Sequence, residues 1–133
     1  HTTGQPLLLW RDEASPDQYA FLITDSDGHS TGVKYSTTVP STNTWTHVAL
    51  TFKGSDVAKL YINGQEDGLG EVDISTIDHI NPTTSHYYIG GNSSGSHDFD
   101  GSIDDVRIYN YALTDHQIKQ LYNGGAALRF SDQ

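Results

Sequence analysis

The chain has 133 residues, and its 17 acidic residues outnumber its 7 Lys and Arg, so the formal net charge is −10. This length suits one domain with a real core, and the acidic charge argues against nucleic acids and anionic membranes, because phosphate groups are bound by basic side chains. The chain has no Cys, which excludes disulfides and thiol chemistry, and no apolar run of about 18 residues that could insert into a membrane.

The first third of the chain contains short apolar runs that are separated by turn-forming residues. Residues 7–10 (LLLW) and 19–24 (YAFLIT) are two such runs, and a strand is expected to restart at residues 32–35. Short β-type runs at this spacing are typical of sandwiches and barrels. The sequence therefore predicts an all-β domain.

A clear strand pattern follows in residues 45–54 (WTHVALTFKG). Val48, Leu50 and Phe52 alternate with other residues, as expected for a strand with one buried face. Trp45 begins this strand after a polar turn, which favours a core position for its side chain.

The next apolar run is predicted to complete a hairpin and to open another. Leu60 and Ile62 are expected to point inward, and Asn63 and Gly64 form a dipeptide that favours tight turns between strands. Residues 69–85 show little periodicity, so we expect mostly loop there.

Two more strands are predicted before the end of the chain, at residues 86–91 (HYYIGG) and at residues 99–109. In the second, alternation places Asp104 on the same face as Val106 and Ile108.

One helix is predicted at the C-terminal end. Thr114 and Gln117 have the spacing of a capping box, in which each side chain bonds to the other residue's N–H. Gly124 suits the left-handed residue that ends many helices. Residues 126–130 (AALRF) are expected to form a last short strand.

Four segments, in this order and spacing, carry a resemblance to a known family: residues 45–54, 59–68, 87–91 and 99–124. On these segments the chain resembles a laminin-G-like domain of the concanavalin A-like lectin/glucanase superfamily, of the bacterial and environmental type. The resemblance implies a single antiparallel β-sandwich (a jelly roll) over residues 1–133, with one short C-terminal helix. It further implies a secreted or cell-surface protein. Such domains often bind glycans or proteins and often hold a structural calcium ion.

Family members usually carry several strands before the segment that resembles residues 7–12 (LLLWRD). We expect these strands to be lacking here, either because the domain is a minimal version or because another segment, such as residues 126–130, fills one slot. A sandwich without these strands has open sheet edges, and open edges recruit further strands. Self-association through the edges is therefore expected as one form of partnership.

Asp104 is the sharpest candidate for a metal ligand. A carboxylate on a core-facing row is costly unless it bonds to N–H groups or to a cation, and both interpretations remain open. Calcium prefers several oxygen ligands, and the best candidate set is Asn92, Asp98, Asp100 and Asp104. The stretch at residues 25–28 (DSDG) is a second candidate but is better explained as a turn.

Sugar sites combine exposed aromatic faces with polar side chains that bond to hydroxyl groups. The candidate ligand-binding residues, expected at one loop end of the sandwich, are Trp10, Arg11, Asp12, His29, Tyr35 and His97.

The sequence argues against an enzyme. Glycoside hydrolysis requires a pair of carboxylates that flank the glycosidic bond, whereas Glu13, Glu66 and Glu71 are the only Glu residues and form no such pattern. No G-x-S-x-G motif or phosphate-binding loop occurs, and the seven His residues lack the HExxH spacing of zinc sites.

Two functions remain. The first is a non-catalytic, lectin-like carbohydrate-binding module of a secreted or surface protein, with or without the help of calcium, whose partner is a glycan or an extracellular protein. The alternative is a structural, assembly or adhesion subunit that associates through its sandwich edges and binds no sugar.

Overall fold

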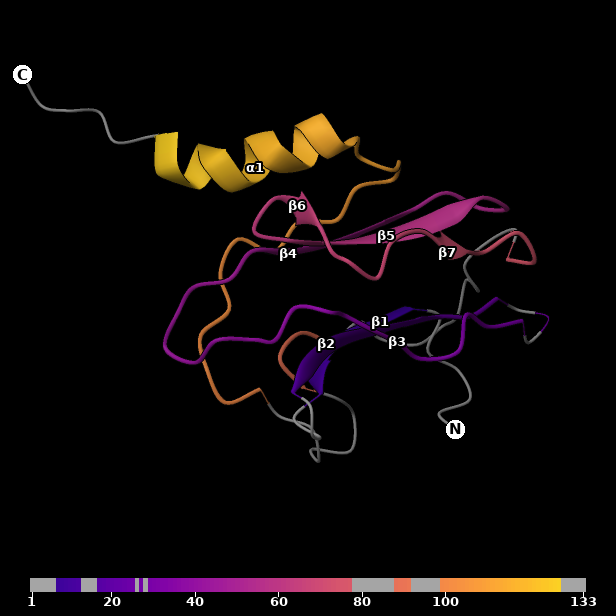
Figure 1. Ribbon diagram of the computed structural model, residues 1–133, viewed down its shortest axis with the longest axis horizontal. Helices are drawn as coiled ribbons and strands as arrows, with labels where there is room; N and C mark the ends of the chain where they lie inside the picture. The colour runs from indigo at the N-terminus through magenta and orange to yellow at the C-terminus, as the bar shows by residue number, and fades with distance from the viewer. Residues whose placement is uncertain are drawn as a thin grey trace, which may run out of the picture.

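The computed structural model describes residues 7–12, 17–25, 27, 29–77, 88–91 and 99–127. In these residues two antiparallel β-sheets lie face to face, and one helix covers the outer side of the second sheet (Figure 1). The prediction of an all-β sandwich with one short helix is confirmed.

The first sheet contains three strands in the order β1-β2-β3. Its strands are β1 (Leu7–Asp12), β2 (Gln18–Ile23) and β3 (Lys34–Tyr35). β1 pairs with β2 along its whole length, from Leu7 opposite Ile23 to Asp12 opposite Gln18. Because side chains alternate along a strand, Phe21 and Ile23 share one face, and both are fully buried against the second sheet.

The second sheet contains four strands, and both β6 and β7 pair with β5. Its strands are β4 (Val48–Phe52), β5 (Val57–Ile62), β6 (Gln65–Glu66) and β7 (Val72–Asp73). Asn63 and Gly64 join β5 to β6 with φ angles of 50° and 75°. Positive φ at both central residues is what a type I′ hairpin turn requires, so the predicted tight turn is confirmed.

The core fills the space between the two sheets. Leu50 of β4 lies opposite Leu60 of β5, and Val48 lies opposite Ile62, so the predicted inward faces of both strands are confirmed. The buried core residues are Phe21, Ile23, Ala58, Leu60, Ile62, Val72, Ile74 and Ile77.

The segment after β6 contributes more structure than the sequence predicted. Val72 pairs with Ala58 of β5 within β7, and Val72, Ile74 and Ile77 are buried. The prediction of mostly loop over residues 69–85 is therefore wrong at β7, because a two-residue strand is too short to show periodicity and is defined by its partner. Residues 78–85 lie outside the described part of the chain.

The strand predicted for residues 99–109 does not form. Asp105 has a φ of 54°, and this left-handed conformation interrupts an extended strand and its alternation of faces. Asp104 is exposed, and its Oδ1 accepts the N–H of Asp105 at 2.8 Å. Because Ile108 is 81% exposed, the predicted core-facing row of Asp104 is wrong.

The strand predicted for residues 86–91 is also not observed where it can be checked. The structure describes residues 88–91, which form no strand, and Gly90 has a φ of 76°. The carbonyl of Gly90 instead accepts the N–H of Phe99 at 2.9 Å.

Helix α1 (Asp115–Ala127) begins as predicted but ends later. The N–H of Gln117 donates to Thr114 Oγ1 at 3.3 Å, and the N–H of Thr114 donates to Gln117 Oε1 at 2.9 Å, which confirms the capping box. The predicted end at Gly124 is wrong, because glycine permits the left-handed conformation but does not impose it. Residues 126 and 127 are therefore helical rather than part of a strand, and residues 128–130 are not described.

Helix α1 packs on the outer face of the second sheet (Figure 1). The rings of His47 and Tyr122 are 5.9 Å apart between centroids, and burial lowers the pKa of His47. Within the described residues, no helix is long and apolar enough to cross a membrane.

Candidate functional site

A small hollow lies at one end of the sandwich, where both sheets meet the loop that precedes β4. Tyr19 of β2 and Ile62 at the end of β5 line it from opposite sheets, and Val39 and Pro40 complete its apolar lining. The polar side chains that line it carry hydroxyl or amide groups: Thr38, Ser41, Thr44, Thr46 and Asn63. No charged side chain occurs among these lining residues.

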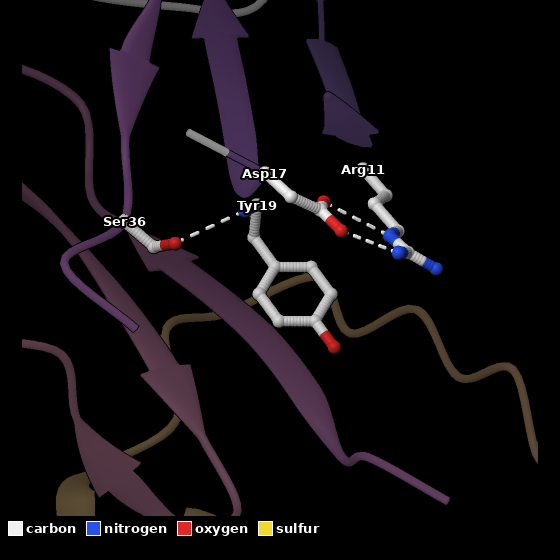
Figure 2. A network of polar contacts seen from close by, with 4 residues as sticks. All are labelled: Arg11, Asp17, Tyr19 and Ser36. Atoms are coloured by element: carbon white, nitrogen blue, oxygen red, sulfur yellow. Dashed lines mark hydrogen bonds and ion pairs between the residues drawn. The ribbon is translucent and has the colours of Figure 1, made fainter. Parts of the chain in front are cut away.

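Ser36 ties the loop to the first sheet, as Figure 2 shows. The N–H of Tyr19 donates to Ser36 Oγ at 3.0 Å, and the N–H of Ser36 donates to the carbonyl of Tyr19 at 2.8 Å. The Ser36 hydroxyl donates in turn to the carbonyl of Thr38 at 2.6 Å. Ser36 is only 1% exposed, so these bonds are shielded from water and hold Tyr19 beside the loop.

Asp67 ties the same loop to the second sheet from the segment after β6. Its carboxylate accepts the N–H groups of Thr37 at 2.7 Å, Thr38 at 3.0 Å and Leu69 at 3.0 Å, and the Thr38 hydroxyl donates to it at 2.6 Å. Burial alone raises the pKa of Asp67, but the bonds from Thr38, Thr37 and Leu69 outweigh it and hold that pKa below the ordinary value. The hollow is therefore built on a loop that is fixed at two points.

Arg11 lies next to Tyr19, its partner across β1 and β2. Figure 2 shows its guanidinium bound to both oxygens of Asp17, with Nε at 3.0 Å from Oδ1. The hydrogen bond from Arg11 lowers the pKa of Asp17. The two charges offset each other, so Arg11 is not an isolated cation beside Tyr19.

Trp45 is the exposed aromatic residue beside the hollow. It lies in the chain between Thr44 and Thr46, which both line the hollow, and its side chain is 69% exposed. The core position predicted for Trp45 is therefore wrong. β4 begins only at Val48, so the strand alternation that would turn Trp45 inward does not reach it.

Two of the predicted ligand residues share a different face of the molecule. Trp10, Ala20 and Tyr35 lie directly opposite one another across β1, β2 and β3. Because Phe21 of β2 faces the core, the alternation places this row on the outer face of the first sheet. Trp10 is half-buried and Tyr35 is exposed, and both lie on the side opposite to Tyr19.

The other predicted ligand residues do not join them in one cluster. Arg11 and Asp12 lie at one end of β1, whereas His29 lies beyond the far end of β2, where its Nδ1 is 2.7 Å from Asp25 Oδ2. A six-residue strand separates the two ends by about 17 Å. His97 lies outside the described residues.

The predicted calcium ligands are only partly described. Asp100 and Asp104 are exposed, and Asn92 and Asp98 fall outside the described part of the chain. Among the described residues, no group of three or more His, Cys, Asp or Glu could hold a metal ion. In the second candidate stretch, the carboxylate of Asp25 accepts backbone N–H groups of its own turn. The described donors alone do not build a calcium site.

Sequence reasoning missed the polar wall of the hollow. Residues 36–46 (STTVPSTNTWT) contain seven hydroxyl-bearing Ser and Thr residues, four of which line the hollow, and one Trp. That composition, an aromatic residue flanked by hydroxyls, was the available signal. Its spatial partners Tyr19 and Ile62 are distant in sequence, so no local pattern joins them to the loop.

A family model described as the concanavalin A-like lectin/glucanases superfamily matches residues 1–119. No curated protein matches the chain. Among solved structures, the chain is similar to an S-layer domain-containing protein from Clostridium thermocellum ATCC 27405, with 29% identity and a TM-score of 0.47. That match covers 91% of this chain and 64% of the other, so this chain spans less than two thirds of that structure. The family match confirms the resemblance predicted from the sequence, and the chain belongs to the concanavalin A-like lectin/glucanase superfamily.

Proposed function

We propose that this domain is a non-catalytic carbohydrate-binding module of a secreted or cell-surface protein, and that the hollow beside Trp45 receives a sugar. The observation that carries the proposal is the lining of the hollow, which combines Tyr19 with hydroxyl and amide side chains; the exposed Trp45 lies in the chain between two of these lining residues. Sites for small polar ligands combine apolar and aromatic surface with a few placed polar groups in this way.

The proposed mechanism uses stacking and hydrogen bonds. The apolar face of a sugar ring stacks on the exposed indole of Trp45, while sugar hydroxyls bond to the polar lining. Ser41 and Thr46 make no side-chain hydrogen bond to another residue in the described part of the chain, so both hydroxyls can serve a ligand.

Preorganisation supports this mechanism. Ser36 fixes the loop to β2, and Asp67 fixes it to the segment after β6. A site that is already ordered loses less conformational entropy when its ligand binds. The two anchors therefore favour useful affinity from a small contact area.

The absence of a carboxylate from the lining supports a non-catalytic role. Hydrolysis of a glycosidic bond needs two carboxyl groups at the scissile bond, and the described lining residues include none. Glu66 and Glu71 instead form ion pairs with Lys59 at 3.2 Å and 2.9 Å.

Calcium has no part in this mechanism. The separate proposal that Asn92, Asp98, Asp100 and Asp104 hold a calcium ion is tested by adding a chelator to the binding assay.

The two tryptophans allow a direct test. In Trp10→Phe only Trp45 emits, and in Trp45→Phe only Trp10 emits, so each variant reports on one candidate site. We expect sugars that are selected on a glycan array to change the emission of Trp10→Phe and to bind Trp45→Phe at least tenfold more weakly. A response confined to Trp10 would move the site to the outer face of the first sheet. No binding by the wild-type chain would overturn the proposal.

A specific observation favours the second function, an assembly or adhesion subunit. The segment before α1 exposes several large apolar side chains: Ile103, Val106, Ile108, Tyr109 and Tyr111. Sedimentation velocity over a wide range of protein concentrations tests this function. Concentration-dependent association without sugar binding would favour assembly, through this segment or through the sheet edges, and a monomer that binds sugar would reject it.

A further inference from the structure

We infer that the hollow selects neutral, hydroxyl-rich sugars over uronic acids, because its lining carries no cation, the Asp67 carboxylate lies behind it and the Thr38 hydroxyl can only accept from a ligand. This inference rests on the proposed function and deepens it by naming the ligand class. It assigns Asp67 as a positioning residue that acts on the ligand through Thr38.

The first step concerns the proton of the Thr38 hydroxyl. Thr38 lines the hollow, and its Oγ1 donates to Asp67 Oδ2 at 2.6 Å. Asp67 is 5% exposed and is held as an anion by the N–H groups around it. A carboxylate can only accept hydrogen bonds, so the proton of the Thr38 hydroxyl is used in the bond to Asp67. Any further bond that Thr38 Oγ1 makes is one in which it accepts.

The second step extends the same logic to Thr44. Its Oγ1 donates to the carbonyl of Thr42 at 3.3 Å, and Thr44 also lines the hollow. Ser41 and Thr46 can also donate to a ligand, but Thr38 Oγ1 and, through its longer and exposed bond, Thr44 Oγ1 accept from a donor of the ligand. A sugar O–H group supplies one, whereas a carboxylate cannot, because it has no proton to give at neutral pH.

The third step concerns charge. The lining carries no cation, and Arg11 nearby is paired with Asp17. The nearest fixed charge behind Thr38 is the anionic Asp67, and the whole chain carries a net charge of −10. A uronate would enter this field without a partner, and burying an unpaired charge is costly.

The test uses sugar pairs that differ only at C6: oligosaccharides of glucose and glucuronate, galactose and galacturonate, and mannose and mannuronate. We expect the neutral member of any pair that binds to do so at least tenfold more tightly, with little dependence on salt. A uronate that binds as tightly as its neutral counterpart would overturn this inference and leave the proposed function intact. If no member of any pair binds, the proposed function and this inference fall together.

Thr37 provides a matched control for Thr38. Both hydroxyls bond to Asp67, at 3.2 Å for Thr37 and 2.6 Å for Thr38, but only Thr38 lines the hollow. We expect Thr38→Val to weaken binding of the neutral sugar about five- to tenfold, as the loss of one hydrogen bond implies, and Thr37→Val to leave it within about twofold. Melting temperatures of the two variants verify that both fold. Equal losses of affinity in both variants would overturn the role assigned to Thr38.

Discussion

The hydroxyl of Tyr61 donates a hydrogen bond of 2.7 Å to Oδ1 of Asp115, which joins the middle of the second sheet to the first turn of α1. Tyr61 lies on the face of β5 that points away from the core, yet it is only 1% exposed. The helix therefore buries an aromatic side chain that the sheet alone would leave in water. An acidic residue in the first turn also complements the positive end of the helix dipole.

The first prediction is that Tyr61→Phe lowers the free energy of unfolding by about 1 kcal/mol, because one partly buried hydrogen bond is lost. Urea denaturation measures this change. Asp115→Asn and the double variant complete a cycle, in which we expect the two substitutions to be non-additive because they remove the same bond. Strictly additive effects would mean that the bond does not stabilise the fold.

The second prediction concerns alkaline pH. Burial, followed by the hydrogen bond to Asp115, raises the pKa of Tyr61 from 10.0 to about 12. Because the pKa is higher in the folded state, the stabilisation is complete below the unfolded value and is lost as the pH rises from 10.0 to about 12. The difference in unfolding free energy between the wild type and Tyr61→Phe should therefore stay constant below pH 10.0 and shrink as the pH rises from 10.0 to about 12. A difference in unfolding free energy that stays constant over this pH range would contradict the prediction.

The third prediction is that Asp67→Asn destabilises the domain by about 2–4 kcal/mol, because an amide nitrogen cannot accept the N–H groups and hydroxyls that surround the carboxylate. Asp73→Asn is the control. Asp73 also accepts an N–H group, from Ser75 at 2.8 Å, but it is exposed, so we expect a smaller loss. Guanidinium denaturation of both variants gives the comparison.

The lowered pKa of Asp67 also predicts how the stability difference between the wild type and Asp67→Asn changes at low pH. Its pKa is lowered from 3.8 in the folded state, so its stabilisation is present above that value and is lost as the pH falls through the folded pKa. The wild type should therefore lose its advantage over Asp67→Asn only under strongly acidic conditions. An advantage that already disappears at neutral pH would show that Asp67 is not ionised in the fold.

The fourth prediction uses two glycines with similar backbone conformations. Gly64 has a φ of 75°, and an added Cβ would lie 2.9 Å from Cδ1 of Tyr122, whereas Gly70 has a φ of 73° and nothing within 4 Å. Gly70→Ala measures backbone strain alone, which is about 1–2 kcal/mol. We expect Gly64→Ala to cost more, because the helix must also shift at Tyr122. Equal losses of unfolding free energy would mean that α1 does not press on this turn.

Local chemistry explains which predictions from the sequence succeeded. The turn at Asn63 and Gly64 needs only two residues that tolerate positive φ, and the capping box of Thr114 and Gln117 closes within one helical turn. The predictions that failed depended on more than local chemistry. Residues 99–109 alternate like a strand, but Asp105 adopts a φ of 54°, and alternation does not reveal that change of direction.

The candidate site shows the same contrast between what local patterns reveal and what they miss. The sequence by itself determined the all-β class, the inward faces of β4 and β5 and the start of the helix, because each follows from residues that are close together in the chain; the antiparallel sandwich followed from the family resemblance. Only the tertiary structure decided that Tyr19, Thr38 and Ile62 meet in one hollow, that Asp67 commits the Thr38 proton, and that Trp45 stays exposed. Those relationships depend on how two sheets pack across a shared core, and packing brings together side chains that no local pattern connects.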